Sequence, residues 1–449
     1  MTKKPNIIWI FSDQQPAYSL ACNGDPNSRT PNLDRMSASG FNFRNAVSGF
    51  PLCCPFRGSL LTGRYPHNCV PGHEFPLPPE LPTAADIFND AGYHTAYFGK
   101  WHLDGVHEYE HPRACKEYIP PERRGRFQRW LGYENNNMQY DCHIHGHTAP
   151  GVEVPMYKLP GYETDELTSL LCDYLREREN NDRPFFTILS VQPPHNPYLA
   201  PAECAVKYNP QTIKLRPNVA HNPSVEDRAR HDLAGMYAMI ENLDTNVGRI
   251  LDTLRATGLE EDTWVFYFSD HGDMHGSHGQ WLKVIPYHEA TNIPFIVWNN
   301  SNYRSMHHMT DGRPPYPINT PDILPTTLGL AGIEVPAYIE GFDYSSIFRG
   351  KRPENPPASA YLQNVSPTRH HDSTDRPYRG VLTADNWKYV CTENDDWMLF
   401  DLNTDPLEEC NLAFNSRHAI PKRDELRKMT ADWIAATKDT FPPPKHGKK

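Results

Sequence analysis

The chain has 449 residues, a formal net charge of −11 and a mean hydropathy of −0.68. No run approaches the ~20 apolar residues of a membrane-spanning helix, and the acidic balance argues against nucleic acid as the main partner. The 23 Tyr, 19 Phe and 9 Trp supply apolar area for a large core, so the 44 prolines do not indicate a disordered chain.

The ten cysteines are scattered and form no C-x-x-C pair, which argues against a zinc ribbon or a thioredoxin motif. Isolated cysteines in a long chain are typical of free thiols in a reducing compartment. The apolar run at Ile7–Phe11 is shorter than the ~7–15 residues of a signal-peptide core. We therefore expect a cytoplasmic protein from the sequence as given, or a periplasmic or secreted one if a leader preceded it.

Apolar runs rich in β-branched and aromatic residues predict four buried strands, at Asn6–Ser12, Thr95–Gly99, Phe185–Val191 and Trp264–Ser269. Helical patterns lie between them, a short one at Thr83–Ala91 and a long one at Glu226–Thr257. Strands that alternate with helices predict an α/β fold, in which helices sandwich a large, mainly parallel or mixed sheet.

Each predicted strand is followed by polar side chains at its carboxyl end: Asp13 and Gln14, Lys100 and His102, His195, and Asp270 and His271. In such sheets ligands bind beyond the carboxyl ends of the strands, so these groups should converge on one cleft. Carboxylate and amide oxygens suit Ca²⁺ or Mg²⁺ better than zinc. A cation surrounded by lysines and histidines would bind phosphate or sulfate. The alternative is that the acids only cap helices.

The strongest motif is Cys53-Cys54-Pro55-Phe56-Arg57, followed by Leu61-Thr62-Gly63-Arg64. With these paired motifs the sequence resembles the formylglycine-dependent (type I) sulfatases of the alkaline phosphatase superfamily, whose signature is C-x-P-x-R and a downstream L-T-G-R. Other marks of that family follow in order: SDQQ at 12–15, TPNLDRMSASG at 30–40, GKWH at 99–102 and SDHGDMHGSHGQWLK at 269–283. The resemblance covers most of residues 5–345.

The resemblance implies an alkaline phosphatase-like fold and hydrolysis of a sulfate ester, such as that of a sulfated carbohydrate. It implies that a formylglycine-generating enzyme binds transiently and oxidises Cys53 to formylglycine (3-oxoalanine), whose hydrate is the nucleophile. A divalent cation, Ca²⁺ or alternatively Mg²⁺ or Mn²⁺, would be held by Asp13, Gln14, residue 53, Asp270 and His271. His195 with Lys283 would serve the leaving alcohol and His102 the diol, while Lys100 and Arg57 would stabilise the formylglycine and the sulfate charge.

Two positions depart from the usual family pattern. Phe56 replaces a small residue in the modification motif, and Gln14 stands where many relatives carry Asp. The second departure leaves a phosphonate monoester or phosphodiester hydrolase as an alternative function. The first leaves an unmodified, non-catalytic anion-binding relative. In either case, we expect Cys54 to be a buried structural thiol, because the register of Pro55 and Arg57 favours Cys53 as the nucleophile.

Three further groups of residues are candidates for substrate binding. Arg123 and Arg124 lie in the stretch Tyr109–Pro150, which is either a substrate-recognition insertion or a solvated surface loop. His143, His145 and His147 form H-x-H-x-H, as zinc ligands on one face of a strand would, or as part of a polar loop near the cleft entrance. Arg369 and His370 could reach the cleft from the C-terminal part.

Proline and charge at Arg349–Pro357 predict a linker between two parts of the chain. Beyond it we expect short antiparallel strands at Tyr378–Thr383, Trp387–Thr392 and Trp397–Leu402, and a helix at Pro421–Thr437. The sequence therefore predicts a catalytic domain over residues 1–350 and a C-terminal subdomain over 358–449 that completes the substrate pocket. It predicts no oligomeric state.

Overall fold

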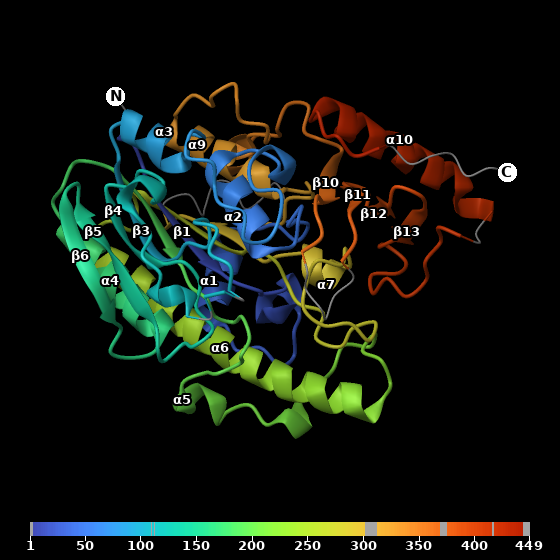
Figure 1. The fold of residues 1–449 in the computed structure, drawn as a ribbon, viewed down its shortest axis with the longest axis horizontal. Helices are drawn as coiled ribbons and strands as arrows, with labels where there is room; N and C mark the ends of the chain where they lie inside the picture. Colours follow the sequence, from blue (N-terminus) through green and yellow to red (C-terminus); the bar gives the residue numbers. More distant parts are fainter. Residues whose placement is uncertain are drawn as a thin grey trace.

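A nine-stranded mixed sheet lies at the centre of the computed structural model, which describes residues 3–108, 110–111, 113–300, 312–368, 375–414 and 417–442 (Figure 1). Within these residues the strand order is β2-β9-β8-β1-β7-β3-β4-β5-β6. The strands are β1 Asn6–Ser12, β2 Phe41–Asn42, β3 His94–Lys100, β4 Arg129–Tyr133, β5 His143–Ala149, β6 Val152–Lys158, β7 Phe185–Ser190, β8 Thr263–Ser269 and β9 Phe295–Trp298. The central run from β8 to β4 is parallel, and the outer strands pair antiparallel.

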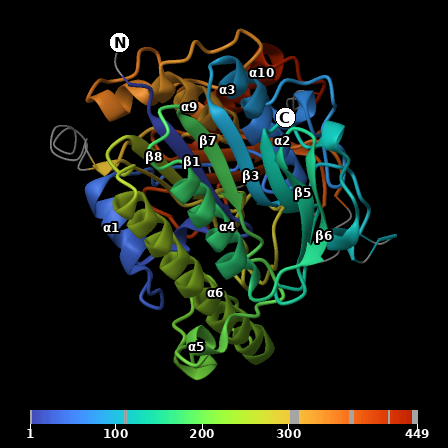
Figure 2. The same cartoon turned by 90° about the vertical axis from the view of Figure 1, so that its left-hand side faces the viewer.

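Helices cover both faces of this sheet, as the side-chain alternation of β1 requires. Ile7, Trp9 and Phe11 belong to one core cluster, and Ile8 and Ile10 belong to another. The first cluster includes residues of α2 (Cys53–Thr62), α3 (Ala84–Asp90) and α9 (Ile323–Ala331). The second includes residues of α1 (Pro31–Ser39), α4 (Glu163–Glu177) and α6 (Pro223–Ala256), and Figure 2 shows α4 and α6 crossing the sheet. This arrangement confirms the predicted α/β sandwich.

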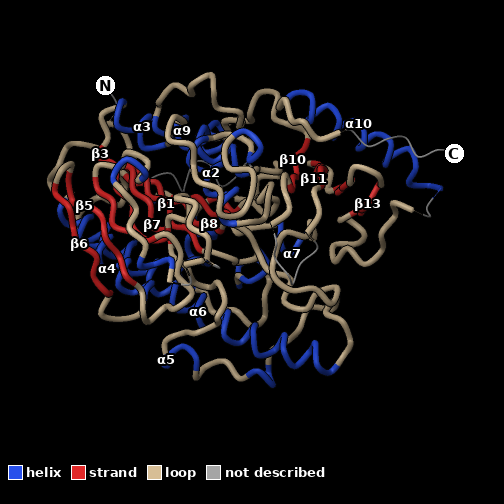
Figure 3. The backbone as a smooth tube through the Cα atoms, in the orientation of Figure 1, coloured by secondary structure: helices blue, strands red, loops and turns tan. Residues whose placement is uncertain are grey.

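A second, four-stranded antiparallel sheet lies at one end of the molecule (Figure 3). Its strands are β10 Ser359–Asn364, β11 Tyr378–Thr383, β12 Trp387–Cys391 and β13 Asp396–Asp401, and α10 (Ile420–Ala436) packs against β11 and β12. The short helices α5 (Ala202–Ala205) and α7 (His288–Thr291) lie in connections. The predicted C-terminal strands and helix are confirmed, and β10 is an additional strand that the sequence analysis missed.

Hydrogen bonds tie the small sheet to the segment that carries Lys283. The Tyr378 hydroxyl donates to the Val284 carbonyl at 3.1 Å, and the Lys388 ammonium donates to the Pro286 carbonyl at 3.0 Å. The His288 amide donates to Glu408, which also forms a fully buried ion pair with Lys388. The C-terminal part of the chain therefore holds a loop that belongs to the cleft.

The stretch 109–150 contains β4 and the whole of β5, so part of it belongs to the large sheet and is not a solvated surface loop. Among the described helices, none combines the length and apolar character needed to cross a membrane.

Candidate active site

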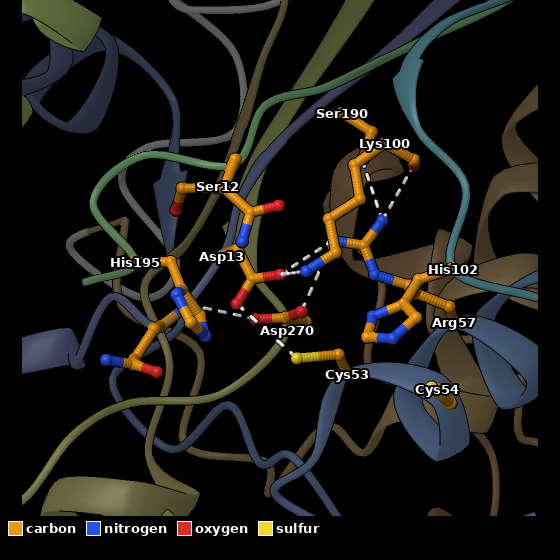
Figure 4. Close-up of polar contacts among 12 residues, drawn as sticks. Ser12, Asp13, Cys53, Cys54, Arg57, Lys100, His102, Ser190, His195 and Asp270 are labelled. Carbon is orange, nitrogen blue, oxygen red and sulfur yellow. Dashed lines mark hydrogen bonds and ion pairs between the residues drawn. The ribbon is translucent and has the colours of Figure 1, made fainter. Parts of the chain in front are cut away.

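Cys53 is the first residue of α2 and points into a buried cluster at the carboxyl ends of β1 and β8 (Figure 4). Its sulfur lies 3.5 Å from Asp13 Oδ1 and 3.2 Å from His271 Nε2. Asp13 directly follows β1, while Asp270 and His271 follow β8, so the parallel pairing of these two strands brings the side chains together. All four are buried.

Two buried cations neutralise these carboxylates. Arg57, one turn further along α2, donates to Asp13 at 3.1 Å and to Asp270 at 3.4 Å. The Lys100 ammonium donates to the same Asp13 oxygen at 2.7 Å. A second nitrogen of Arg57 donates to the Ser190 hydroxyl and the Lys100 carbonyl at 2.8 and 2.9 Å, so the guanidinium is held by residues at the ends of four strands, β1, β3, β7 and β8.

The electrostatics separate the two carboxylates. Burial would raise the pKa of Asp13, but the charges of Lys100 and Arg57 outweigh burial and hold that pKa well below its usual value. Burial and the charge of Asp13 raise the pKa of Asp270 to about 7. Burial, reinforced by Asp13, also raises the pKa of the Cys53 thiol to about 12, so an unmodified Cys53 would be a poor nucleophile at neutral pH.

His195 and Lys283 form a pair on the neighbouring wall. The Lys283 ammonium lies 2.9 Å from His195 Nε2, and His195 Nδ1 lies 2.6 Å from the Asn196 carbonyl, to which it donates. Burial and the charge of Lys283 lower the pKa of His195 well below its usual value, so the imidazole is neutral. Lys283 also donates to the Gln14 amide oxygen at 2.7 Å.

The cluster around Cys53 fits a hard divalent cation. Ligand atoms of Asp13, Cys53, Asp270 and His271 lie within 4.8 Å of one another. His271 Nδ1 donates to the Gly272 carbonyl at 3.0 Å, which leaves the Nε2 lone pair towards the carboxylates. Two carboxylates in such a set favour Ca²⁺ or Mg²⁺. The side-chain oxygen of Gln14 accepts the hydrogen bond from Lys283, so it could bind the cation only if it contacted Lys283 and the cation together.

His102 lies on the other side of Cys53, next to a cavity of about 410 Å³. Its backbone is left-handed, with φ of 53°, and its ring is 2% exposed. The cavity also exposes Cys53, Lys100, His195 and Lys283, so five of the six predicted catalytic residues line it. Arg57, the sixth, lies beneath them as a partner of Asp13.

Several cavity residues carried no individual sequence signal, because they come from connections without a motif, although Arg113 and three asparagines lie in the stretch Tyr109–Pro150, a candidate for substrate recognition. They are His73, Glu74, Glu108, Arg113, Asn135, Asn136, Asn137 and Thr368. Glu134 lies just behind the cavity and accepts the backbone amides of Leu103, Asp104 and Gly105 at 3.2, 2.9 and 3.1 Å. It thereby fixes the chain that follows His102. Only the position of Glu134 after a buried strand could have suggested this role.

The four described residues that were predicted to bind substrate, Arg123, Arg124, His143 and His145, do not line this cavity. Arg123 pairs with Asp104, and Arg124 is fully buried against the Tyr118 and Trp130 rings and the Glu153 carboxylate. His143 and His145 lie on β5 rather than in a loop. His145 accepts the Ile119 amide, and His143 lies 3.8 Å from Asp141. Arg369 and His370 lie outside the described residues, so their predicted role rests on the sequence alone.

Comparison with known proteins agrees with this geometry. The Sulfatase family model matches residues 5–333, which is most of the chain, and a model for the C-terminal part of N-sulphoglucosamine sulphohydrolase matches residues 276–432. The chain belongs to the sulfatase family. Its fold is that of the alkaline phosphatase-like sulfatases, and family membership implies a formylglycine at the modified cysteine and a divalent metal.

This sulfatase is similar to two characterised relatives over nearly its whole length. It is 36% identical to the ulvan-active sulfatase of Formosa agariphila, covering 91% of this chain and 77% of the relative. It is 30% identical to the endo-4-O-sulfatase of Bacteroides thetaiotaomicron, covering 93% and 89%. A crystal structure from Bacteroides fragilis, described as a YidJ sulfatase, superposes with a TM-score of 0.85 at 27% identity, covering 98% of this chain and 97% of that one.

Proposed function

We propose that the protein hydrolyses a sulfate monoester of a carbohydrate, with formylglycine made from Cys53 and a bound Ca²⁺ ion. The observation that carries the proposal is the position of Cys53. Its side chain lies between a buried carboxylate pair and a cavity whose wall includes Lys100, His102 and the His195–Lys283 pair. The carbohydrate part rests on the similarity to the ulvan-active sulfatase and the endo-4-O-sulfatase, and on the polar side chains that line the cavity.

The proposed site includes two groups that are not encoded amino acids, a divalent cation and a formylglycine. Asp13, Asp270, His271 and residue 53 would hold the cation, with Gln14 as the further ligand predicted from the sequence, and Ca²⁺ would neutralise the carboxylates and polarise the nucleophile. Formylglycine would supply a hydrated aldehyde, a better nucleophile than the thiol that burial keeps protonated. The proposed partner for its formation is a formylglycine-generating enzyme, which binds transiently.

The cationic side chains bind and orient the sulfate. Lys100 is fully buried, lines the cavity and already contacts Asp13, so its ammonium can bridge the carboxylate and a sulfate oxygen. Asp13 outweighs the opposing effect of burial and raises the pKa of Lys100, so the lysine stays charged. Arg57 contributes positive charge from beneath and fixes both carboxylates.

The His195–Lys283 pair can deliver a proton to the leaving alcohol. Because His195 donates through Nδ1 to the Asn196 carbonyl, its Nε2 accepts a hydrogen bond from the Lys283 ammonium. Both side chains line the cavity, so Lys283 can transfer this proton to Nε2, and Nε2 can then pass it to the departing oxygen. His102 faces Cys53 from the other wall, and burial, reinforced by Lys100, lowers its pKa well below the usual range. A neutral imidazole there can accept a proton from the nucleophile.

We propose that residues 358–449 form a subdomain that shapes the carbohydrate side of the pocket. Thr368 lines the cavity, and Tyr378, Lys388 and Glu408 hold the backbone of residues 284–288. These contacts support a role for the small sheet in specificity. The free state of all ten cysteines supports the expectation of a reducing, cytoplasmic location.

The decisive comparison is between sulfate and phosphorus esters. The modified, calcium-loaded enzyme should hydrolyse 4-nitrophenyl sulfate and desulfate sulfated oligosaccharides of the kinds that its relatives are named for. Much faster cleavage of an aryl phosphonate monoester or a phosphodiester would contradict the sulfatase assignment. It would favour the alternative function, a phosphonate monoester or phosphodiester hydrolase, which Gln14 leaves open. No turnover of any ester by fully modified protein would favour a non-catalytic anion-binding protein.

A further inference from the structure

A second group of metal-ligand atoms surrounds Cys54. The Cys54 sulfur and ring nitrogens of His73 and His102 lie within 4.8 Å of one another. They come from three separate segments: the first turn of α2, the connection before α3 and the turn that follows β3. The Cys54 sulfur lies 3.9 Å from His73 Nδ1. Tetrahedral zinc, with Zn–S of about 2.3 Å and Zn–N of about 2.0 Å, places such atoms about 3.5 Å apart, so this pair needs to move only slightly to bind the ion.

His102 supplies an independent sign of a missing ligand. The ring is 2% exposed, yet neither of its nitrogens has a hydrogen-bond partner in the described part of the chain. Its nearest recorded carboxylate, that of Glu108, lies 3.9 Å from Nε2. A buried polar atom without a partner costs free energy, so an imidazole in this state is suited to receive a ligand from the adjoining cavity.

The surroundings of Cys54 suit a bound cation. The Glu74 backbone amide donates to the Cys54 sulfur at 3.3 Å, while burial raises the pKa of the Cys54 thiol well above its usual value, so the thiol keeps its proton until a metal ion displaces it. The Glu74 carboxylate lies 3.5 Å from His73 Nε2. Sulfur with two imidazoles favours Zn²⁺ strongly over Ca²⁺, which prefers oxygen. The two clusters would therefore select different metals.

We propose that Cys54, His73 and His102 form a second metal site for Zn²⁺ or a similar thiophilic divalent ion, and that its occupation inhibits the enzyme by engaging His102. On binding, the Cys54 thiol loses its proton to solvent, and the sulfur and the two imidazole nitrogens each donate a lone pair. No oxidation or reduction occurs. Three protein ligands leave a fourth position for water or for the Glu108 carboxylate. Only the inhibition rests on the proposed function; the binding does not.

Zinc binding can be measured without any turnover. The Cys53→Ala variant removes the neighbouring thiol, and saturating Ca²⁺ occupies the oxygen-rich site. Titration against a chromophoric zinc chelator should then show a single tight site. Co²⁺ in place of Zn²⁺ should give a thiolate-to-cobalt charge-transfer band. Absence of tight zinc binding by this folded, calcium-loaded protein would overturn the proposal.

Matched second substitutions identify the ligands. Adding Cys54→Ser should weaken zinc binding by more than about 100-fold and remove the cobalt band. The loss of a metal ligand lowers affinity more than the roughly 10–100-fold that follows the loss of a residue hydrogen-bonded to a ligand. Adding His73→Ala, at the cavity wall, should weaken zinc binding similarly. This variant tests the same site if the Cys54 variant does not fold. Adding Cys410→Ser, which removes the exposed thiol, should change nothing. Equal zinc affinity in the Cys54 and His73 variants and their parent would overturn the proposal.

Inhibition is tested in the modified enzyme, with each protein compared to its own zinc-free activity. Micromolar Zn²⁺ in excess Ca²⁺ should inhibit the parent, and a zinc-selective chelator should restore activity. Cys54→Ser should raise the inhibitory concentration by more than about 100-fold, in parallel with its affinity. Zinc that binds through Cys54 and leaves turnover unchanged would refute the inhibitory part alone, whereas an enzyme that has no sulfatase activity at all would refute the proposed function.

Discussion

Cys53 and Cys54 are adjacent in α2, and the side chains around them have different chemistry. Cys53 faces Asp13, Asp270 and His271, a set rich in oxygen, whereas Cys54 faces His73 and His102. Successive side chains of an α-helix point about 100° apart, so two neighbours at a helix start can face two different sites. Figure 4 shows the Cys53 sulfur near the carboxylates and Cys54 away from them. A one-residue step therefore separates the proposed nucleophile from the proposed zinc ligand.

The two clusters also differ in how their charges are balanced. Around Cys53, Arg57 and Lys100 pair with the carboxylates, which is the arrangement that buried charges require. Around Cys54, burial lowers the pKa of His73 to about 4 and that of His102 well below its usual value, so both imidazoles are neutral. The charges of the cluster around Cys53 suit a hard cation and an anionic substrate. The neutral imidazoles around Cys54 can each donate a lone pair to a metal ion.

The largest expected effect comes from removing the nucleophile. Cys53→Ala should lower kcat for 4-nitrophenyl sulfate by about 10⁴-fold or more, because no other group near the carboxylates can attack sulfur. The far-ultraviolet circular dichroism spectrum should remain that of the parent, since the substitution removes one buried atom. Cys54→Ala is the matched control, and its loss should be far smaller. Retained turnover in Cys53→Ala would refute the nucleophile assignment.

Removing the proton donor should have an effect that depends on the leaving group. His195→Ala should slow hydrolysis of a carbohydrate sulfate by roughly 10²–10⁴-fold, since a sugar alcohol needs protonation as it leaves. An activated aryl sulfate, with its good leaving group, should lose much less. Steady-state kinetics on both substrates measures the difference. Equal losses on the two would contradict the role assigned to the His195–Lys283 pair.

Removal of the cation should make stability depend on pH through Asp270. Its folded pKa of about 7 lies above the unfolded value of about 3.9, so in chelated protein this group stabilises the fold below about pH 4 and that contribution is lost as the pH rises through about 7. Between about pH 5 and pH 8 the Tm of chelated protein should fall more than that of Asp270→Asn. Ca²⁺ should cancel the difference, because the cation replaces the proton. The same pH dependence in both chelated proteins would refute this assignment.

The smallest effect is expected from Cys54 in the absence of zinc. Cys54→Ala leaves a small void in the core and should lower the free energy of unfolding by about 1 kcal/mol. The same change should abolish the response of the unfolding midpoint to Zn²⁺, which a purely structural thiol would not influence. Urea unfolding with and without Zn²⁺ measures both quantities. An unchanged zinc response would show that Cys54 is a structural thiol and no more.

The sequence predicted the centre of the fold better than its edge. β1, β3, β7 and β8 are buried on both faces, so they are continuous apolar runs that can be recognised without a structure. β6, at Val152–Lys158, is an edge strand with mostly exposed residues and lacks such a run. β5 contains three histidines and a glycine, and its pairing with β4 depends on contacts that lie far apart in the sequence.

The same contrast holds for the site. Asp13, Lys100, His195 and Asp270 follow predicted strands closely, so sheet topology alone brings them together. Glu74 and Glu108 come from connections, whose course the sequence does not determine. Arg124 was a plausible substrate ligand until its partners were known, because an arginine that stacks on Trp130 and pairs with Glu153 has the same sequence appearance as a free one.

The state of residue 53 in active protein tests the central claim most directly. Mass spectrometry of the proteolytic peptide that spans residues 53–57, on enzyme from its native host, should find the aldehyde in place of the Cys53 thiol and an intact thiol at Cys54. The modified fraction should rise in proportion to sulfatase activity across preparations. Full activity in protein that carries only unmodified Cys53 would contradict the account.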